Sequence, residues 1–271
     1  MKITLVRERQ NGLRPYSMNL YGDESNYQLI SVSGLDPVQA QLNMSTIVGQ
    51  DGTSYVSSKL NNRNIVIMMA IQGNAEANRL QLYTYFPPKS KIRVQIVTET
   101  RNVFIDGYVE YINCNAFEKG IKAQISIICP DPWFHGTAVE LEEEMTLEDN
   151  DEFYRYSITN NGDTPAPFYL SFDYQGSATG FVLTCTQAAK NAGTLDVTGG
   201  NFDDPTWIIV DTGNKTVTYN SGSIIPYLEP TSEFFYLPVG VSTVEIHIHW
   251  NGNVGGNGRS QLSFDPLYGG V

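Results

Sequence analysis

The sequence predicts an all-β fold with one α-helix, arranged as two β-sandwich domains. Strand-like runs of alternating or continuous apolar residues recur along the chain, and turn residues separate them. Aromatic residues make up 11% of the chain, Tyr outnumbers Phe by 16 to 12, and Gly is frequent, with 24 copies. A length of 271 residues fits two domains of the usual size, about 100–200 residues each.

One stretch in the first half carries the signals of a helix. Asn74 is a favourable N-cap residue, and Glu76 lies in the first turn, where a carboxylate suits the helix dipole. Pro87-Pro88 ends the segment, because proline removes a backbone donor and clashes with the preceding turn. The apolar stripe of this helix is expected to consist of Leu80, Tyr83, Leu82 and Phe86.

Strands are predicted on both sides of the helix. The nearly continuous apolar run 65–71 indicates a central buried strand, whereas 91–98 alternates between apolar and polar residues. The residues around Asp51-Gly52 predict a hairpin, since Asp-Gly between two strand-like runs is a strong hairpin signal. Four further strands of the first half are expected at 2–6, 26–32, 103–112 and 121–128.

The runs that flank this turn, 39–49 and 55–59, are rich in Gln, Asn and Ser and would make a poor pair of core strands. We therefore predict a hairpin that projects from the first domain and reaches another chain; a surface hairpin without a partner is the alternative. Its tip, and the candidate subunit interface, is Gln50, Asp51, Gly52 and Thr53.

A domain boundary is predicted after His135. Pro130 and Pro132 cannot donate to a strand ladder, so the preceding strand ends there. The first domain then covers 1–135 and the second 136–271, where turn signals recur about every 8–12 residues, as is typical of a sandwich. Strands of the second domain are expected at 153–159, 168–174, 181–184, 194–197, 207–211, 216–220, 233–237, 241–250 and 261–264.

The two halves differ strongly in charge. Residues 1–135 hold 13 Lys and Arg against 11 Asp and Glu, a net charge of +2; residues 136–271 hold 4 against 18, a net charge of −14. The phosphates of nucleic acids and anionic lipids repel such an acidic half, which argues against either as a partner. No run approaches the ~18–20 apolar residues of a membrane span, and residues 1–6 are too short for a signal peptide, so we expect the product to stay in the cytoplasm of the cell that makes it.

No pattern of catalytic or cofactor-binding residues is evident, and we predict no enzyme and no cofactor. The acidic residues of 140–152 crowd one segment, as a solvated face does, whereas a glycosidase needs two carboxylates across a cleft. A calcium loop at 148–153 would need Gly where Phe153 stands. The acidic run comprises Glu140, Glu142, Glu143, Glu144, Glu148, Asp149, Asp151 and Glu152.

Three weaker candidate sites remain. Glu245, His247 and His249 alternate on one strand and would share a face, which allows a metal site or simply a wet strand face. Trp207 and Trp250 are candidate sugar contacts, but both lie among apolar residues of their strands, which favours core packing. The basic residues Lys89, Lys91 and Arg93 are a candidate interface strand that meets acidic neighbours or protects an edge strand from mispairing.

Cys114, Cys129 and Cys185, without metal-site spacing, are expected to be buried free thiols.

The order of motifs in the first half resembles the distal tail protein (Dit) family of siphophages. The helix leads into Phe86-Pro87-Pro88, a basic strand and the run 105–110, Ile-Asp-Gly-Tyr-Val-Glu. The most specific part is the closing run 124–134, a strand followed by Cys-Pro-Asp-Pro-Trp-Phe. Residues 49–52 and 63–67 also fit the first-domain pattern of the family, and the resemblance covers residues 1–135.

This resemblance implies a structural protein of the virion tail tip. Six copies would form a ring around the tail axis through their first domains, with a galectin-like or carbohydrate-module-like second domain pointing outward. The ring would join the major tail tube protein to a tail-tip lysin or spike protein and, in many phages, carry receptor-binding proteins. A lectin-like module for attachment to the host surface is the alternative function.

Overall fold

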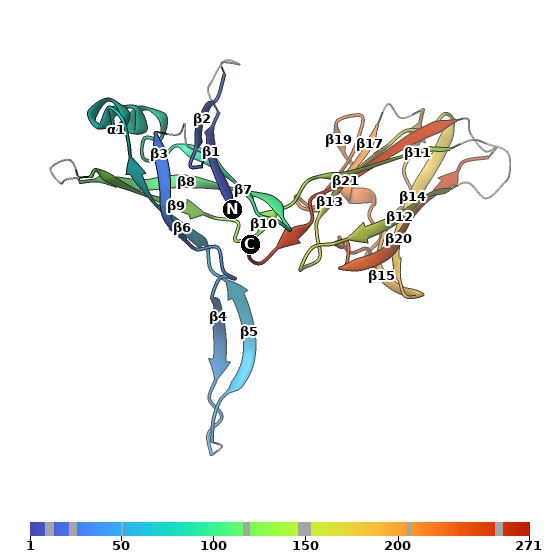
Figure 1. The fold of residues 1–271 in the computed structure, drawn as a ribbon. Helices are drawn as coiled ribbons and strands as arrows, with labels where there is room; N and C mark the ends of the chain where they lie inside the picture. The colour runs from blue at the N-terminus through green and yellow to red at the C-terminus, as the bar shows by residue number, and fades with distance from the viewer. Residues whose placement is uncertain are drawn as a thin grey trace. The chain divides into compact units, whose positions relative to one another are not determined.

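In the computed structural model the chain divides into two compact units, and the structure describes residues 1–8, 14–21, 26–49, 51–115, 120–145, 153–204, 207–252 and 257–271 (Figure 1). Unit 1 comprises Met1–Gly136 together with Tyr268–Val271, and unit 2 comprises Thr137–Leu267. The fold class is all-β with one α-helix, as predicted. No helix among the described residues is both long and apolar enough to cross a membrane.

Unit 1 is built on one nine-stranded sheet. Seven strands follow the order β2-β1-β7-β8-β9-β6-β3, while β10 pairs with β8 and with β22. One face of the sheet supplies the core, because buried and exposed residues alternate along strands such as β7. The strands are β1 (Lys2–Arg7), β2 (Tyr16–Asn19), β3 (Tyr27–Ser33), β6 (Arg63–Ile71), β7 (Lys91–Val97), β8 (Asn102–Cys114), β9 (Lys122–Cys129), β10 (Phe134–His135) and β22 (Leu267–Tyr268).

The helix α1 (Ala75–Tyr85) begins where the sequence predicts. The Asn74 side chain accepts a hydrogen bond from the Ala77 backbone N–H at 3.3 Å, which satisfies one donor of the first turn. The predicted stripe is only partly right: Leu82 and Phe86 are buried, but Leu80 is 51% exposed. Leu82 and the C-cap residue Phe86 therefore attach the helix to the sheet; they lie four positions apart and so share one face of the helix.

Unit 2 is a sandwich of two main sheets. The six-stranded sheet has the order β11-β21-β13-β17-β18-β19, and the other has the order β12-β20-β14-β15, with β16 paired to β14. The two sheets meet at buried aromatic rings; those of Phe172 and Phe181 lie edge to face with centroids 5.1 Å apart. The buried Tyr156 hydroxyl donates across the sandwich to Ser260 Oγ at 2.6 Å.

The bounds of these strands are β11 (Val139–Met145), β12 (Phe153–Asn160), β13 (Phe168–Phe172), β14 (Ser177–Gln187), β15 (Lys190–Val197), β16 (Phe202–Asp203), β17 (Ile208–Asp211), β18 (Thr216–Tyr219), β19 (Gly222–Ser223), β20 (Gly240–Trp250) and β21 (Gly258–Phe264). A short 3-10 helix, η2 (Ile225–Tyr227), follows β19.

In unit 2 the structure adds one strand to the prediction and removes another. The start of the acidic run is strand β11; its Glu140 and Glu142 are exposed, as expected of a solvated face, while Val139 and Leu141 are half-buried, and the acidic residues hide this alternation in the sequence. The predicted strand at 233–237 does not form. Leu237 makes an isolated β-bridge to Ala166, and the Glu233 N–H donates to the Thr194 carbonyl at 3.0 Å. Glu148, Asp149, Asp151 and Glu152, and with them the calcium-loop segment, lie outside the described residues.

The last four residues of the chain belong to unit 1, although the sequence analysis assigned 136–271 as a whole to the second domain. They are fixed by backbone contacts that have no signature in the sequence. The Val271 backbone N–H donates to the Leu35 carbonyl at 3.1 Å, and the Arg101 guanidinium donates to the Gly270 carbonyl and lies 4.4 Å from the centre of the Tyr268 ring. Unit 2 is thus inserted into unit 1 along the chain.

Candidate functional site

The strands β4 (Ala40–Ser45) and β5 (Ser54–Leu60) form the predicted hairpin (Figure 1). They make a separate two-stranded sheet, and every residue in both strands is exposed. A hydrogen bond from the Asn61 N–H to the Gln39 carbonyl, at 3.3 Å, closes the base. The hairpin is therefore a two-stranded ribbon with both faces open to solvent. The side chains on each face determine what that face can bind.

The strand register sorts the hairpin residues into an apolar and a polar face. Residues alternate between faces along a strand, and cross-strand partners share a face. A bulge at Val56 shifts the register, so that Met44 lies opposite Tyr55 instead of Val56. The apolar hairpin face consists of Ala40, Leu42, Met44, Tyr55 and Leu60, with the hydroxyl of Ser58; the polar hairpin face consists of Gln41, Asn43, Ser45, Ser54, Ser57 and Lys59.

Large side chains of the apolar hairpin face are open to solvent. Leu42 is 57% exposed, Met44 51% and Tyr55 61%. On the polar hairpin face, Asn43 Nδ2 donates to Ser57 Oγ at 2.8 Å and ties the two strands together. A contiguous exposed apolar surface marks a binding site for another macromolecule more often than chance exposure does. The β4 half of this face is visible in the sequence, where Ala40, Leu42 and Met44 alternate with polar residues, but the bulge breaks the alternation along β5.

The predicted tip lies in the loop between β4 and β5. Asp51, Gly52 and Thr53 are exposed, and Gln50 lies outside the described residues. Gly49 and Gly52 both have positive φ, +86° and +89°, which favours glycine at these two turn positions. The exposed apolar side chains of this loop precede the predicted tip: Val48 is 99% exposed and Ile47 45%.

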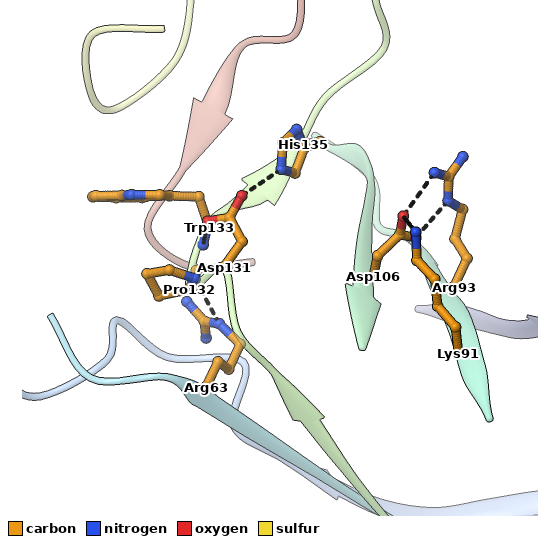
Figure 2. Close-up of polar contacts among 8 residues, drawn as sticks. All are labelled: Arg63, Lys91, Arg93, Asp106, Asp131, Pro132, Trp133 and His135. Carbon is orange, nitrogen blue, oxygen red and sulfur yellow. Dashed lines mark hydrogen bonds and ion pairs between the residues drawn. The ribbon is translucent and has the colours of Figure 1, made fainter. Parts of the chain in front are cut away.

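The basic strand is internal to the sheet, so the interpretation that it protects an edge strand is wrong. β7 pairs with β1 on one side and β8 on the other. Arg93 makes a bidentate ion pair with Asp106, with Nε–Oδ1 at 2.7 Å and Nη2–Oδ2 at 3.0 Å (Figure 2). Lys91 Nζ lies 3.4 Å from Asp106 Oδ2, and Lys89 occupies the preceding turn with φ of +71°.

On the outer face of this sheet, the side chains of Arg93, Phe104 and His135 stack in a row. Its guanidinium lies 4.0 Å from the centre of the Phe104 ring, and the His135 ring stacks on Phe104 with centroids 5.2 Å apart. His135 Nε2 lies 2.9 Å from Asp131 Oδ2 (Figure 2). Burial acts to raise the pKa of Asp131, but the hydrogen bonds from His135 and the Trp133 N–H outweigh it and lower the pKa. Much of the positive charge of this strand is neutralised within the chain.

The tryptophan and histidine candidates do not converge on one site. Trp250 is half-buried and its ring meets that of Tyr174 edge to face at 5.2 Å, whereas Trp207 is 38% exposed. His247 Nε2 lies 3.5 Å from Glu245 Oε2, while Glu245 Oε1 accepts from Arg155 Nε at 2.6 Å. Within the described ranges no three His, Cys, Asp or Glu side chains are placed to hold a metal ion.

The three cysteines are free thiols. Cys129 and Cys185 are buried, and Cys114 is half-buried. Burial raises the pKa of Cys129 to about 12 and also raises that of Cys185. A thiol that stays protonated is a poor nucleophile, so these two side chains serve packing.

No protein-family model matches the sequence, and no curated protein matches it. Among solved structures, the chain is similar to Dit of phage SPP1, described as a paradigm of hub adsorption apparatus in phages that infect Gram-positive bacteria. The TM-score is 0.66, the sequence identity is 16%, and the match covers 98% of each chain. It is also similar to a chain of the phage p2 baseplate in its activated conformation with Sr, with a TM-score of 0.50 and 8% identity over 97% of this chain and 98% of that chain. The chain therefore has the fold of a phage Dit hub protein, which confirms, for the fold, the resemblance drawn from residues 1–135.

Proposed function

We propose that this protein is a structural hub subunit of a phage tail tip. Six copies form a ring through unit 1, and the β4–β5 hairpin of each copy lays its apolar face on the neighbouring copy. The exposed apolar hairpin face carries this proposal, because it is a ready-made surface on a chain whose fold is that of a Dit hub protein.

The mechanism is geometric and makes or breaks no covalent bond. A head-to-tail contact repeats around an axis, and it closes into a ring only when the rotation per subunit divides a full turn. Each copy then both supplies a hairpin and receives one. In this arrangement the ring joins the tail tube protein to a tail-tip lysin or spike protein, and receptor-binding proteins attach at the periphery. The site of action is the virion tail tip, after assembly in the host cytoplasm.

The acidic second half suits a peripheral role. Residues 136–271 carry a net charge of −14, so copies of unit 2 repel one another and favour separation around a ring. The same charge favours partners that present a basic surface. Unit 1 forms the ring, because residues 1–135 carry a net charge of only +2 and copies of this part of the chain repel one another little.

The direct test is the mass of the assembled protein. Native mass spectrometry and size-exclusion chromatography with light scattering should show six copies, either for the chain alone or after mixing with the tail tube protein. Negative-stain images of the same sample should show rings. A chain that stays monomeric in both conditions would disprove the proposal.

A further inference from the structure

Arg63 occupies the base of the hairpin and is buried. It is the first residue of β6 and follows the last hairpin residue, Leu60, by only three positions. Its side chain is 1% exposed, which is rare for an arginine and requires partners for its donors.

The Arg63 guanidinium donates to four backbone carbonyls from three segments of unit 1. Nη1 donates to the Gly34 and Asp36 carbonyls at 2.6 and 2.7 Å, on the segment that leads from β3 into β4. Nε donates to the Pro132 carbonyl at 2.8 Å (Figure 2), and Nη2 donates to the Gly269 carbonyl at 2.7 Å. One side chain thus holds both legs of the hairpin, the segment before residue 136 and the returning residues 268–271.

The chemistry of this site favours arginine over any other residue. The guanidinium offers five donors in a fixed plane, whereas a lysine ammonium offers three from one point. Phe134 covers one face of the guanidinium, with its ring centre 4.2 Å away. Burial lowers the pKa of Arg63, while nearby Cys129, Asp131 and Asp36 act to raise it.

The segment that enters the hairpin also binds residues 269–271 directly. Val271 N–H donates to the Leu35 carbonyl, and a Cβ on Gly270 would lie 3.1 Å from that same oxygen and from Pro37 Cδ. Gly34 itself has φ of +87°, and a Cβ there would lie 2.0 Å from the Asn64 carbonyl oxygen. The returning residues therefore touch the hairpin base both through Arg63 and on their own.

We infer that Arg63 is a positioning residue that fixes the direction of the β4–β5 hairpin, and that it does so jointly with residues 268–271. The partner that the hairpin contacts is a second copy of this chain, and in this respect the inference rests on the proposed function. Docking of residues 268–271 in unit 1 then becomes a condition for presenting the apolar hairpin face at the angle that closes a ring.

The test is hydrogen–deuterium exchange on the full chain carrying Arg63→Lys, which keeps the charge but cannot reach four carbonyls. We expect at least tenfold faster exchange of amides in 34–41, 60–62 and 269–271, with β7 and β8 protected as in the wild type. The fraction of six-copy rings should fall at least tenfold. Wild-type exchange at the hairpin base would overturn the inference, and so would a loss of protection spread evenly over unit 1.

A second variant and a control complete the design. Deletion of residues 269–271 leaves Arg63 in place but removes one acceptor, and it should accelerate exchange in 34–41 in the same direction; unchanged exchange there would overturn the role of these residues. Arg7→Lys is the matched control, because Arg7 Nη1 also donates to two carbonyls, of Thr84 and Tyr85, away from the hairpin. If the wild type forms no ring, the proposed function fails, while exchange in the isolated chain still decides the role of Arg63.

Discussion

Met44 and Tyr55 face each other across the β4–β5 hairpin because Val56 is an extra residue in β5. This pairing places a thioether chain next to an aromatic ring on the same exposed face, where both are more than half accessible. The pair is the last cross-strand pair of the apolar hairpin face before the loop, and both side chains are exposed, so it is a suitable place to disrupt the proposed subunit contact.

The double substitution Met44→Asp with Tyr55→Ser should abolish ring formation without unfolding the chain. It places a charge in the proposed contact, yet both side chains are exposed in the single chain, so the melting temperature should shift little. Native mass spectrometry should show at least a tenfold loss of the six-copy species. Ser45→Asp on the polar hairpin face is the matched control and should leave the ring intact; equal loss in both would contradict the assigned face.

Asp106→Asn should destabilise unit 1 by about 0.2–1 kcal/mol at pH 7, the range of exposed ion pairs. The hydrogen bond from Arg93 lowers the pKa of Asp106 in the folded state. Its stabilising effect is therefore present above the unfolded pKa, about 3.9, and is lost as the pH falls through the lower folded value. Chemical denaturation at pH 7 and in acid should show the difference from wild type shrink as the pH falls below the unfolded pKa. Asp51→Asn in the hairpin loop is the control.

Tyr156→Phe should destabilise unit 2 by about 1–3 kcal/mol, because the buried Ser260 hydroxyl loses its partner. The double variant with Ser260→Ala should cost less than the sum of the two single changes, as expected for groups in contact. Burial raises the pKa of Tyr156 to about 12, so its contribution is present below pH 10 and is lost between about pH 10 and 12. Thermal unfolding of the four proteins provides the measurement, and additive effects would contradict the pairing.

Gly34→Ala should be much more harmful than Gly52→Ala, although both glycines have positive φ. Each substitution incurs about 1–2 kcal/mol of backbone strain. At Gly34 the new Cβ would also collide with the Asn64 carbonyl oxygen, whereas at Gly52 there is open space. Equilibrium unfolding should separate the two variants; similar losses would show that the close approach at Gly34 relaxes freely.

Trp207→Ala tests the lectin-like alternative. Trp207 is the more exposed of the two tryptophan candidates, so a stacking platform for sugars would have to use it. A glycan array with the wild-type chain should show no binding under the proposed hub function. Binding that disappears in Trp207→Ala, with the ring unaffected, would establish the attachment role instead.

Much of the fold could be predicted from sequence because its signals are local. Asn74 and Pro87-Pro88 bound the helix, and alternation along 91–98 marks β7. The apolar hairpin face could be predicted only for β4, where apolar and polar residues alternate, since a single bulged residue in β5 sets which of its side chains share that face. The role of Arg63 was equally hidden, because its acceptors are backbone carbonyls and one of them is 206 positions away.

The insertion of unit 2 into unit 1 has a mechanical consequence. A pull on unit 2 is divided between the peptide link after Gly136 and the hydrogen-bonded attachment of residues 268–271. A covalent link outlasts hydrogen bonds, so the attachment would yield first and leave unit 2 on a single tether. Because that attachment shares Arg63 with the hairpin base, traction on unit 2 would loosen the hairpin itself.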